Sequence, residues 1–459
     1  MKLSRLLVHL TALVGVLAGA LLLPGCRKET PPLRAEVKAF YPERLRYFLD
    51  EYEQHGKKNP KWDSAMRQLI ETDTYNVYLH EPTLSPVLLK AFAKLDEAKC
   101  DDPYFRYLSA LYMRRRSSQP YPYATYADAY EALKRSSYGP VLQFLAAHRN
   151  AIHTYDLTDA GKRKRCFSLQ AEAFESILKA VADPTVPDEV ISAGIEAFFQ
   201  WSRAAEPEPV TFNRAPRLQA AIELHRPERA LMLRLLGQLE IQLAWARRSN
   251  SWAYEVTQAG WTGFTQHLDA AEKLLERSWA LQPTGRAACS MITVELGQAR
   301  GRERMELWFN RAMELNPASE EACYAKLHYL RPRWHGSHEE MLRFGVECTE
   351  NSAWSGRVPL VLAFAMEQYL GDYPEADQPR LWTDPKVWAL VKKSYDAYLK
   401  KYPDDDQVRH AYLEKAYRSA AWDDFGRQYK KIDSIKQIYL SREKLDLMLQ
   451  AYGEHEASK

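Results

Sequence analysis

The sequence predicts an all-α protein in which antiparallel helix pairs stack into a superhelix. Helix-forming residues dominate the chain, and glycine accounts for only 19 of its 459 residues. Apolar residues recur at helical spacing after residue 35, and no stretch alternates apolar and polar residues long enough to indicate a sheet. Part of the sequence also repeats with a period of 34 residues, which indicates a repeat architecture.

Residues 1–25 have the pattern of a secretory signal peptide, because a short basic segment precedes the apolar run 6–23. The ending Leu23-Pro24-Gly25-Cys26 resembles the lipobox of bacterial lipoproteins, in which the cysteine takes a diacylglycerol and becomes the new N-terminus. This resemblance implies lipidation of Cys26 and a membrane-anchored location in the cell envelope. Arg27, where aspartate would signal retention at the inner membrane, favours the outer membrane by resemblance to sorting rules. A transmembrane anchor is the alternative, since 18 residues lie near the lower limit for a span.

Prolines divide the next part of the chain into helices. Residues 26–35 are polar and are expected to form a tether, and residues 36–203 are expected to form an N-terminal helical region. Segment 204–216 contains three prolines and no apolar stripe, so it is the predicted domain boundary. The predicted helices cover 40–53, 61–72, 84–98, 103–116, 122–136, 140–154, 163–182, 188–203 and 227–248.

Two later segments repeat each other. Leu281-x-Pro283 and Leu315-x-Pro317 lie 34 residues apart, and a looser copy covers 394–433. The period and the order helix, Leu-x-Pro, helix resemble the tetratricopeptide repeat. The resemblance implies a tetratricopeptide-like domain over 217–350 and further helical repeats over 351–459. Because one helix pair cannot bury its apolar face alone, neighbouring pairs are expected to stack.

Residues from about 250 to 350 resemble a bacterial family catalogued as domain of unknown function 4034. The resemblance rests on Gly260-Trp261, Trp308-Phe309, the segment Leu330-Arg331-Pro332-Arg333-Trp334-His335-Gly336-Ser337, Phe344-Gly345 and Cys348. His335 departs from the family's turn, which often reads Gly-Gly-Ser. The resemblance implies no activity, because none is assigned to the family.

The segment from Trp334 to Glu340 gathers two histidines and two carboxylates, so Trp334, His335 and His338 form a candidate site. The spacing differs from that of helical zinc motifs, and the cluster straddles a turn. The alternative, which we favour, is structural, because Ser337 and Glu340 have the spacing of a capping box. In that case Gly336 makes the turn and Trp334 packs beneath it. We therefore expect no metal, no cofactor and no catalytic residue.

Five cysteines remain after Cys26, so at least one stays unpaired within the chain. Cys289 and Cys323 occupy equivalent repeat positions. Neighbouring helices are ~8–10 Å apart, whereas a disulfide needs Cα atoms within ~7 Å, so this pair is not expected to form a bridge. Cys323 and Cys348 flank the Trp334 turn and could lie level on antiparallel helices. They are a candidate disulfide, with two free thiols as the alternative.

Composition and architecture favour an interaction protein. The net charge of +3 gives no electrostatic case for a nucleic-acid partner, and the basic runs 114–116 and 162–165 lack interleaved aromatic residues. The repeats and the tether predict a scaffold or adaptor that binds a protein or peptide on its concave face. One alternative is a glycan-binding lipoprotein, although Tyr126 and Tyr130 of the aromatic stretch 121–130 are expected to face the core. Another is an enzyme that uses the turn 334–340.

Overall fold

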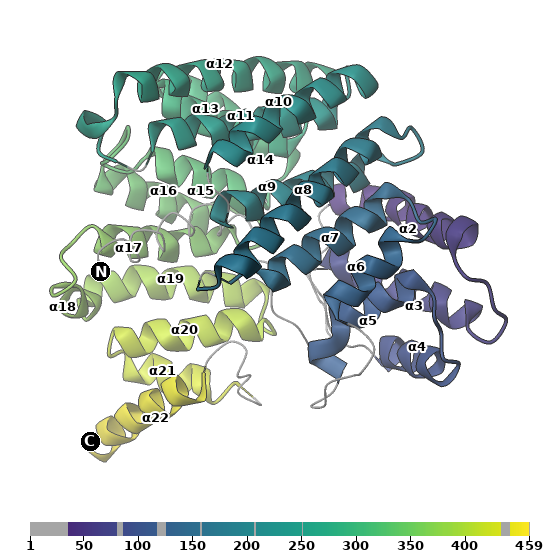
Figure 1. The fold of residues 1–459 in the computed structure, drawn as a ribbon. Coiled ribbons are helices and arrows are strands. Elements are labelled where there is room, and N and C mark those ends of the chain that lie inside the picture. The colour runs from purple at the N-terminus through teal and green to yellow at the C-terminus, as the bar shows by residue number, and fades with distance from the viewer. Residues whose placement is uncertain are drawn as a thin grey trace. The chain divides into compact units, whose positions relative to one another are not determined.

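The protein folds almost entirely into helices (Figure 1). A computed structural model describes residues 35–79, 86–116, 125–156, 158–205, 208–249, 251–432 and 441–458, and no strand occurs in these ranges. The all-α prediction is therefore confirmed. The predicted signal peptide and Cys26 lie outside the described residues, as does the tether except Ala35, which begins a helix. No helix of the described part is long and apolar enough to cross a membrane.

The chain divides into two compact units, Met1–Leu281 and Gln282–Lys459. The first unit contains α2 (Ala35–His55), α3 (Asp63–Leu79), α4 (Pro86–Glu97), α5 (Pro103–Arg116), α6 (Tyr126–Lys134), α7 (Pro140–Thr154), α8 (Ala160–Ala182), α9 (Asp188–Ala205), α10 (Glu208–His225), α11 (Ala230–Arg248), the 3-10 helix η1 (Ala253–Glu255) and α12 (Gln258–Leu281). Each helix predicted within 40–203 has a counterpart here. The predicted bounds of α5 and α7 coincide with those observed, and the other helices differ from their predicted bounds by up to seven residues at one end.

The division into units differs from the predicted boundary at 204–216, because α10 occupies most of that segment. Pro209 is the second residue of α10, where the helix needs no backbone N–H donor. Pro216 lies inside the helix. The division between the two compact units falls after Leu281, inside the first Leu-x-Pro segment.

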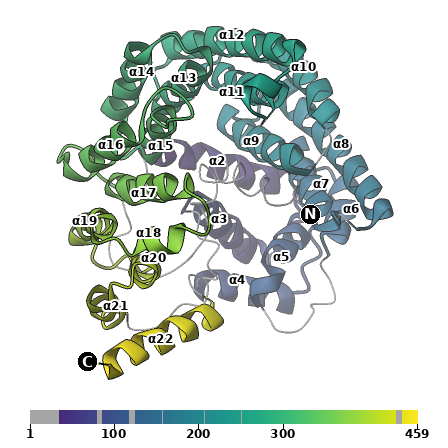
Figure 2. The same ribbon diagram turned by 90° about the vertical axis from the view of Figure 1, so that its left-hand side faces the viewer.

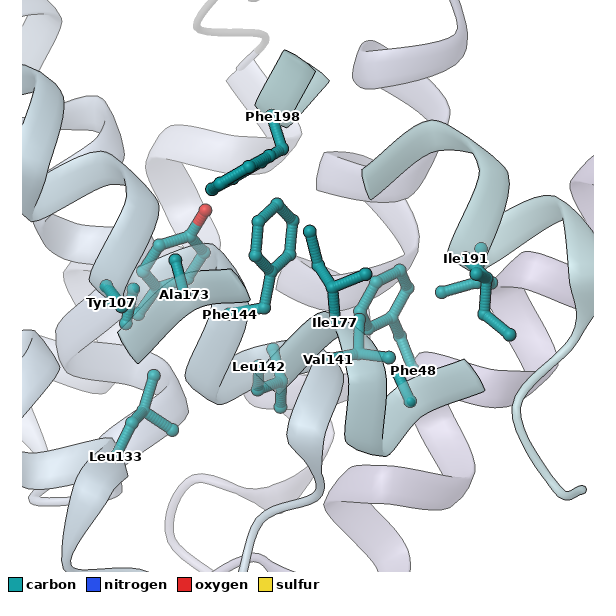
Figure 3. Packing of buried hydrophobic residues seen from close by; sticks show 14 of the residues in the cluster. Phe48, Tyr107, Leu133, Val141, Leu142, Phe144, Ala173, Ile177, Ile191 and Phe198 are labelled. Atoms are coloured by element: carbon teal, nitrogen blue, oxygen red, sulfur yellow. The ribbon is translucent and has the colours of Figure 1, made fainter. Parts of the chain in front are cut away.

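The core of the first unit is rich in aromatic rings. Phe144 of α7, Phe198 of α9 and Ile177 of α8 converge in this core (Figure 3). Phe174 stacks on Phe198 with ring centroids 5.6 Å apart. Burial of each such side chain stabilises the fold by roughly 1.5–3 kcal/mol. The aromatic packing therefore holds α7, α8 and α9 together.

A buried histidine lies within this aromatic core. His148 of α7 stacks on Phe144, and its Nδ1 lies 3.1 Å from Oε1 of Gln170 on α8. Burial lowers the pKa of His148 to about 4. The imidazole is therefore neutral near pH 7, as its apolar surroundings require.

The second unit consists of paired helices that follow one another in chain order (Figure 2, green to yellow). They are α13 (Gly285–Gln298), α14 (Arg302–Leu315), α15 (Glu320–Tyr329), α16 (His338–Glu350), η2 (Val358–Leu360), α17 (Val361–Gly371), α18 (Gln378–Trp382), α19 (Pro385–Lys401), α20 (Asp406–Arg418), α21 (Trp422–Tyr429) and α22 (Arg442–Ala457). Helix α15 contacts the first helix of the pair before it, α13, and of the pair after it, α17.

A buried lysine of this unit is paired with a carboxylate of the preceding helix. Lys326 of α15 is only 6% exposed, and its Nζ lies 2.6 Å from Oε2 of Glu306 on α14. The same ammonium group lies over the rings of Phe309 and Phe344, 4.2 and 4.5 Å from their centroids. Removing one partner of such a pair would leave a buried charge uncompensated, which is strongly destabilising.

Candidate functional site

The turn between α15 and α16 brings backbone groups into close contact. The N–H of His335 donates to the carbonyl oxygen of Tyr329 at 3.1 Å, and that of Gly336 donates to Arg331 at 3.4 Å. A Cβ atom at position 336 would lie 2.7 Å from the carbonyl carbon of Leu330. Glycine is therefore required here for close packing of the backbone, in agreement with its predicted role in the turn.

Ser337 begins α16 as a helix cap, because its Oγ accepts a hydrogen bond from the N–H of Glu340 at 3.1 Å. The Glu340 carboxylate pairs with Arg302 of α14. The serine half of the predicted capping box is thus present, whereas Glu340 connects α16 to α14.

The two histidines of the predicted site have different partners. Nε2 of His335 lies 2.8 Å from the carbonyl oxygen of Leu296, and Nε2 of His338 lies 2.9 Å from Oδ2 of Asp372. The rings pack separately, His335 against Tyr329 and His338 edge-on to Tyr369. Among the described residues no group of three or more His, Cys, Asp or Glu side chains could hold a metal ion.

Asp372, which follows α17, joins this turn to the next helix pair. Its Oδ1 accepts a hydrogen bond from Nη2 of Arg331 at 2.8 Å, while Oδ2 faces His338. Nη1 of Arg331 donates to Oε1 of Gln368, also at 2.8 Å. We did not predict Arg331, Gln368 or Asp372 as site residues. The sequence signal that could have identified Asp372 is the 34-residue period, because Asp372 follows its partner His338 by 34 residues.

His328 of α15 lies beside the same turn and was also missed. Its ring centroid lies 5.6 Å from that of Trp334, which is half-buried. Burial, with the nearby guanidinium groups of Arg331 and Arg333, lowers the pKa of His328 to about 3. The turn therefore holds a neutral imidazole close to two positive charges.

Side chains of α15 and α17 meet along one face. Tyr324 and Phe364 form an edge-to-face ring pair with centroids 4.8 Å apart, and one helical turn further on Gln368 bonds to Arg331. We call the six residues that line these helices the α15–α17 face: Tyr324, His328, Arg331, Phe364, Gln368 and Asp372. All except Asp372 are half-buried, whereas Asp372 is classed as exposed. Aromatic and polar groups on this face are thus held in place and remain partly open to solvent.

Both residues of the candidate disulfide pair, Cys323 and Cys348, are buried. Burial and the neighbouring Cys348 thiol raise the pKa of Cys323. The thiol of Cys289 lies 3.7 Å from the Ser319 hydroxyl group. A bond between Cys323 and Cys348 stays a prediction.

Aromatic residues elsewhere are divided between core and surface. Tyr130 is buried, and Tyr126 stacks on His153 with centroids 4.1 Å apart, whereas Tyr121 and Tyr123 lie outside the described residues. Trp252 precedes the short 3-10 turn η1 and Tyr254 lies within it, and the two residues are 58% and 82% exposed. This turn is fixed by Glu255, whose carboxylate accepts from the N–H of Trp252 at 3.1 Å.

Comparison with protein-family models, curated proteins and solved structures found no match. The resemblance to the domain of unknown function 4034 therefore stays a prediction.

Proposed function

We propose that the protein is a lipid-anchored scaffold or adaptor of the cell envelope that binds a protein or peptide on the α15–α17 face. The observation that carries this proposal is the row of cross-helix contacts on that face. Tyr324 meets Phe364 there, and Arg331 meets Gln368 and Asp372. Stacked helix pairs of repeat proteins form concave binding surfaces, and we assign this face to such a surface.

The composition of the face suits recognition of another protein. Tyrosine and arginine are enriched among the residues that contribute most to interface energy. Their positions are fixed before binding by ring packing and by hydrogen bonds of 2.8 Å from Arg331. Side chains that are already ordered lose less conformational entropy when a partner binds.

The N-terminal segment supports the envelope location in this proposal. A lipidated Cys26 followed by a short polar tether would hold the helical units beside a membrane. Acyl chains contribute roughly 0.8 kcal/mol per buried CH₂ group, and several chains together anchor a protein stably.

Affinity purification from detergent-solubilised envelopes tests the scaffold function. We expect wild type to recover a reproducible partner, and Phe364→Ala to recover much less of it. Leu307→Ala is the matched control, because Leu307 is an exposed residue of α14. Equal recovery by Phe364→Ala and wild type, with both variants folded by circular dichroism, would count against this face.

A second candidate function is binding of a glycan to the exposed rings of Trp252 and Tyr254. Aromatic faces in solvent can stack on sugars. Affinity electrophoresis in gels that contain envelope polysaccharide would show retardation of wild type and loss of retardation in the Trp252→Ala/Tyr254→Ala variant. Leu224→Ala, at an exposed leucine of the same unit, is the control. Identical mobility of all three proteins would remove this candidate.

A further inference from the structure

Near the Trp334 turn, Nδ1 of His328 and Nε of Arg331 are shielded from solvent and lack a hydrogen-bond partner. Buried polar atoms are nearly always hydrogen-bonded in folded proteins, so each exception requires an explanation. Both residues lie on the α15–α17 face.

The two side chains are placed to act together. The N–H of Arg331 donates to the carbonyl oxygen of His328 at 3.2 Å, which continues α15 by a tight turn. Residues three apart in such a turn lie nearly above one another. Nη1 and Nη2 of Arg331 are held by Gln368 and Asp372, so Nε is the guanidinium nitrogen that has no partner.

The chemistry of these atoms specifies an acceptor. Nε of Arg331 can only donate a hydrogen bond, and Nδ1 of a neutral histidine donates in one of its two tautomers. The charges of Arg331 and Arg333 both act on His328. An oxygen that carries negative charge would therefore be favoured over a neutral one.

We propose that His328 and Arg331 form a subsite for a carbonyl-type oxygen of the bound partner, with a carboxylate preferred to an amide. This inference rests on the proposed binding function of the α15–α17 face. Trp334 contacts His328 and is half-buried on the turn, so its ring is the group placed to move when the oxygen enters. A bridging water is the competing explanation of the two unpartnered atoms.

Titration of the full chain labelled with [15N]histidine tests the subsite. Acetate is the carboxylate probe, N-methylacetamide is the amide probe, and sodium chloride keeps the ionic strength constant. The His328 side-chain signal, assigned by its loss in His328→Phe, should shift and saturate with acetate at a lower concentration than with N-methylacetamide. The signal of His335, whose Nε2 is bonded to the Leu296 carbonyl oxygen, should not shift with either probe.

Two variants separate binding from folding. Arg331→Lys keeps the positive charge but has no Nε–H group, and its single ammonium group cannot also hold Gln368 and Asp372. The concentration of acetate that gives half of the His328 shift should therefore rise at least tenfold. His328→Phe removes an unpartnered atom and should leave the melting temperature unchanged or raise it. His148→Phe is the matched control, because His148 is bonded to Gln170 and its loss should lower the melting temperature.

Each outcome decides the proposal. A saturable acetate response that depends on Arg331 supports it, and an equal response to N-methylacetamide would assign the subsite to a neutral carbonyl. No saturable response to either probe, or the same response in Arg331→Lys, would overturn it in favour of a bound water. If the subsite fails while Phe364→Ala still loses the partner, the proposed function stands. If Phe364→Ala keeps the partner, that function fails independently of the subsite.

Discussion

Nε2 of His338 lies 2.9 Å from the carboxylate of Asp372, a residue 34 positions later in the chain. The spacing equals the repeat period, so the contact joins one helix pair to the next. Arg331 shares the same carboxylate. The turn that the sequence offered as a candidate site is, at His338, a connection between two successive helix pairs.

Replacement of Asp372 tests this connection. Asp372→Asn removes the charge that faces Arg331 and His338, and we expect a loss of up to about 1 kcal/mol in the free energy of unfolding. The loss is small because the Asp372 and His338 side chains are about one-third exposed. Urea unfolding of the variant measures it, and Asp377→Asn, at an exposed position nearby, should match wild type. Equal stability of all three proteins would contradict the connecting role.

Gly336 gives a sharper test of the turn. The Cβ of Gly336→Ala would press on backbone atoms of Leu330, so we expect destabilisation by ~1–3 kcal/mol. Gly453→Ala is the control, because nothing lies within 4 Å of its Cβ and Gly453 is inside α22. That change should stabilise the fold by ~0.5–1 kcal/mol. Thermal unfolding measures the melting temperature of both variants. An unchanged melting temperature for Gly336→Ala would show that the turn has room for a Cβ atom at position 336.

Ala299 ends α13 in a left-handed conformation, with φ of 55°. Glycine adopts this conformation at no steric cost and is the usual residue at this position. Ala299→Gly should therefore raise the free energy of unfolding by about 0.5–1 kcal/mol. Chemical denaturation tests the change, with Ala288→Gly, at a buried position in the first turn of α13, as a control that should lose stability. A lower free energy of unfolding in Ala299→Gly than in wild type would argue against the left-handed conformation at the end of α13.

The buried His148 predicts a pH dependence of stability. Its pKa is lowered to about 4 in the folded protein, whereas the unfolded value is about 6.5. Between these values only the unfolded chain binds the proton. Stability should therefore fall as the pH decreases from 6.5 towards 4 and should not depend on this group above that range. Between pH 6.5 and 4 the loss in the free energy of unfolding from this group is on the order of 3 kcal/mol.

His148→Phe should reduce the fall in the free energy of unfolding between pH 6.5 and 4. Some of the fall should remain, because the pKa of His328 is also lowered, to about 3, and this group destabilises the fold in the same pH range. The His148→Phe/His328→Phe double variant should be flatter still between pH 6.5 and 4. Parallel profiles for wild type and both variants would show that neither imidazole is buried as described.

The cysteines predict a slow thiol reaction. Burial raises the pKa of Cys100 to about 12, and Cys166, Cys289, Cys323 and Cys348 are buried. Thiolate is the reactive form, so the native protein should react slowly with a thiol reagent at pH 8. After denaturation without reductant, five thiols of the chain after Cys26 should react. Three reactive thiols would instead indicate one disulfide, for which Cys323 and Cys348 are the candidate pair.

Local sequence signals located most helices because many of them begin at a proline or at a capping side chain. Ser337 was assigned correctly as a cap because its partner is only three residues away. The connections of Arg331 and Asp372 were not predicted, because they depend on how two helix pairs pack. Segment 204–216, predicted as a boundary from its prolines, is largely helical, because Pro216 is accommodated within α10.

The proposed function depends most directly on what touches Phe364. A photoreactive phenylalanine analogue can be placed at position 364 on the α15–α17 face and, as a control, at the exposed Glu314 of α14. Irradiation of intact cells should give one discrete crosslinked protein at position 364 and none at 314. Equal crosslinking at both positions, or none at position 364, would contradict the proposal that this face binds a partner.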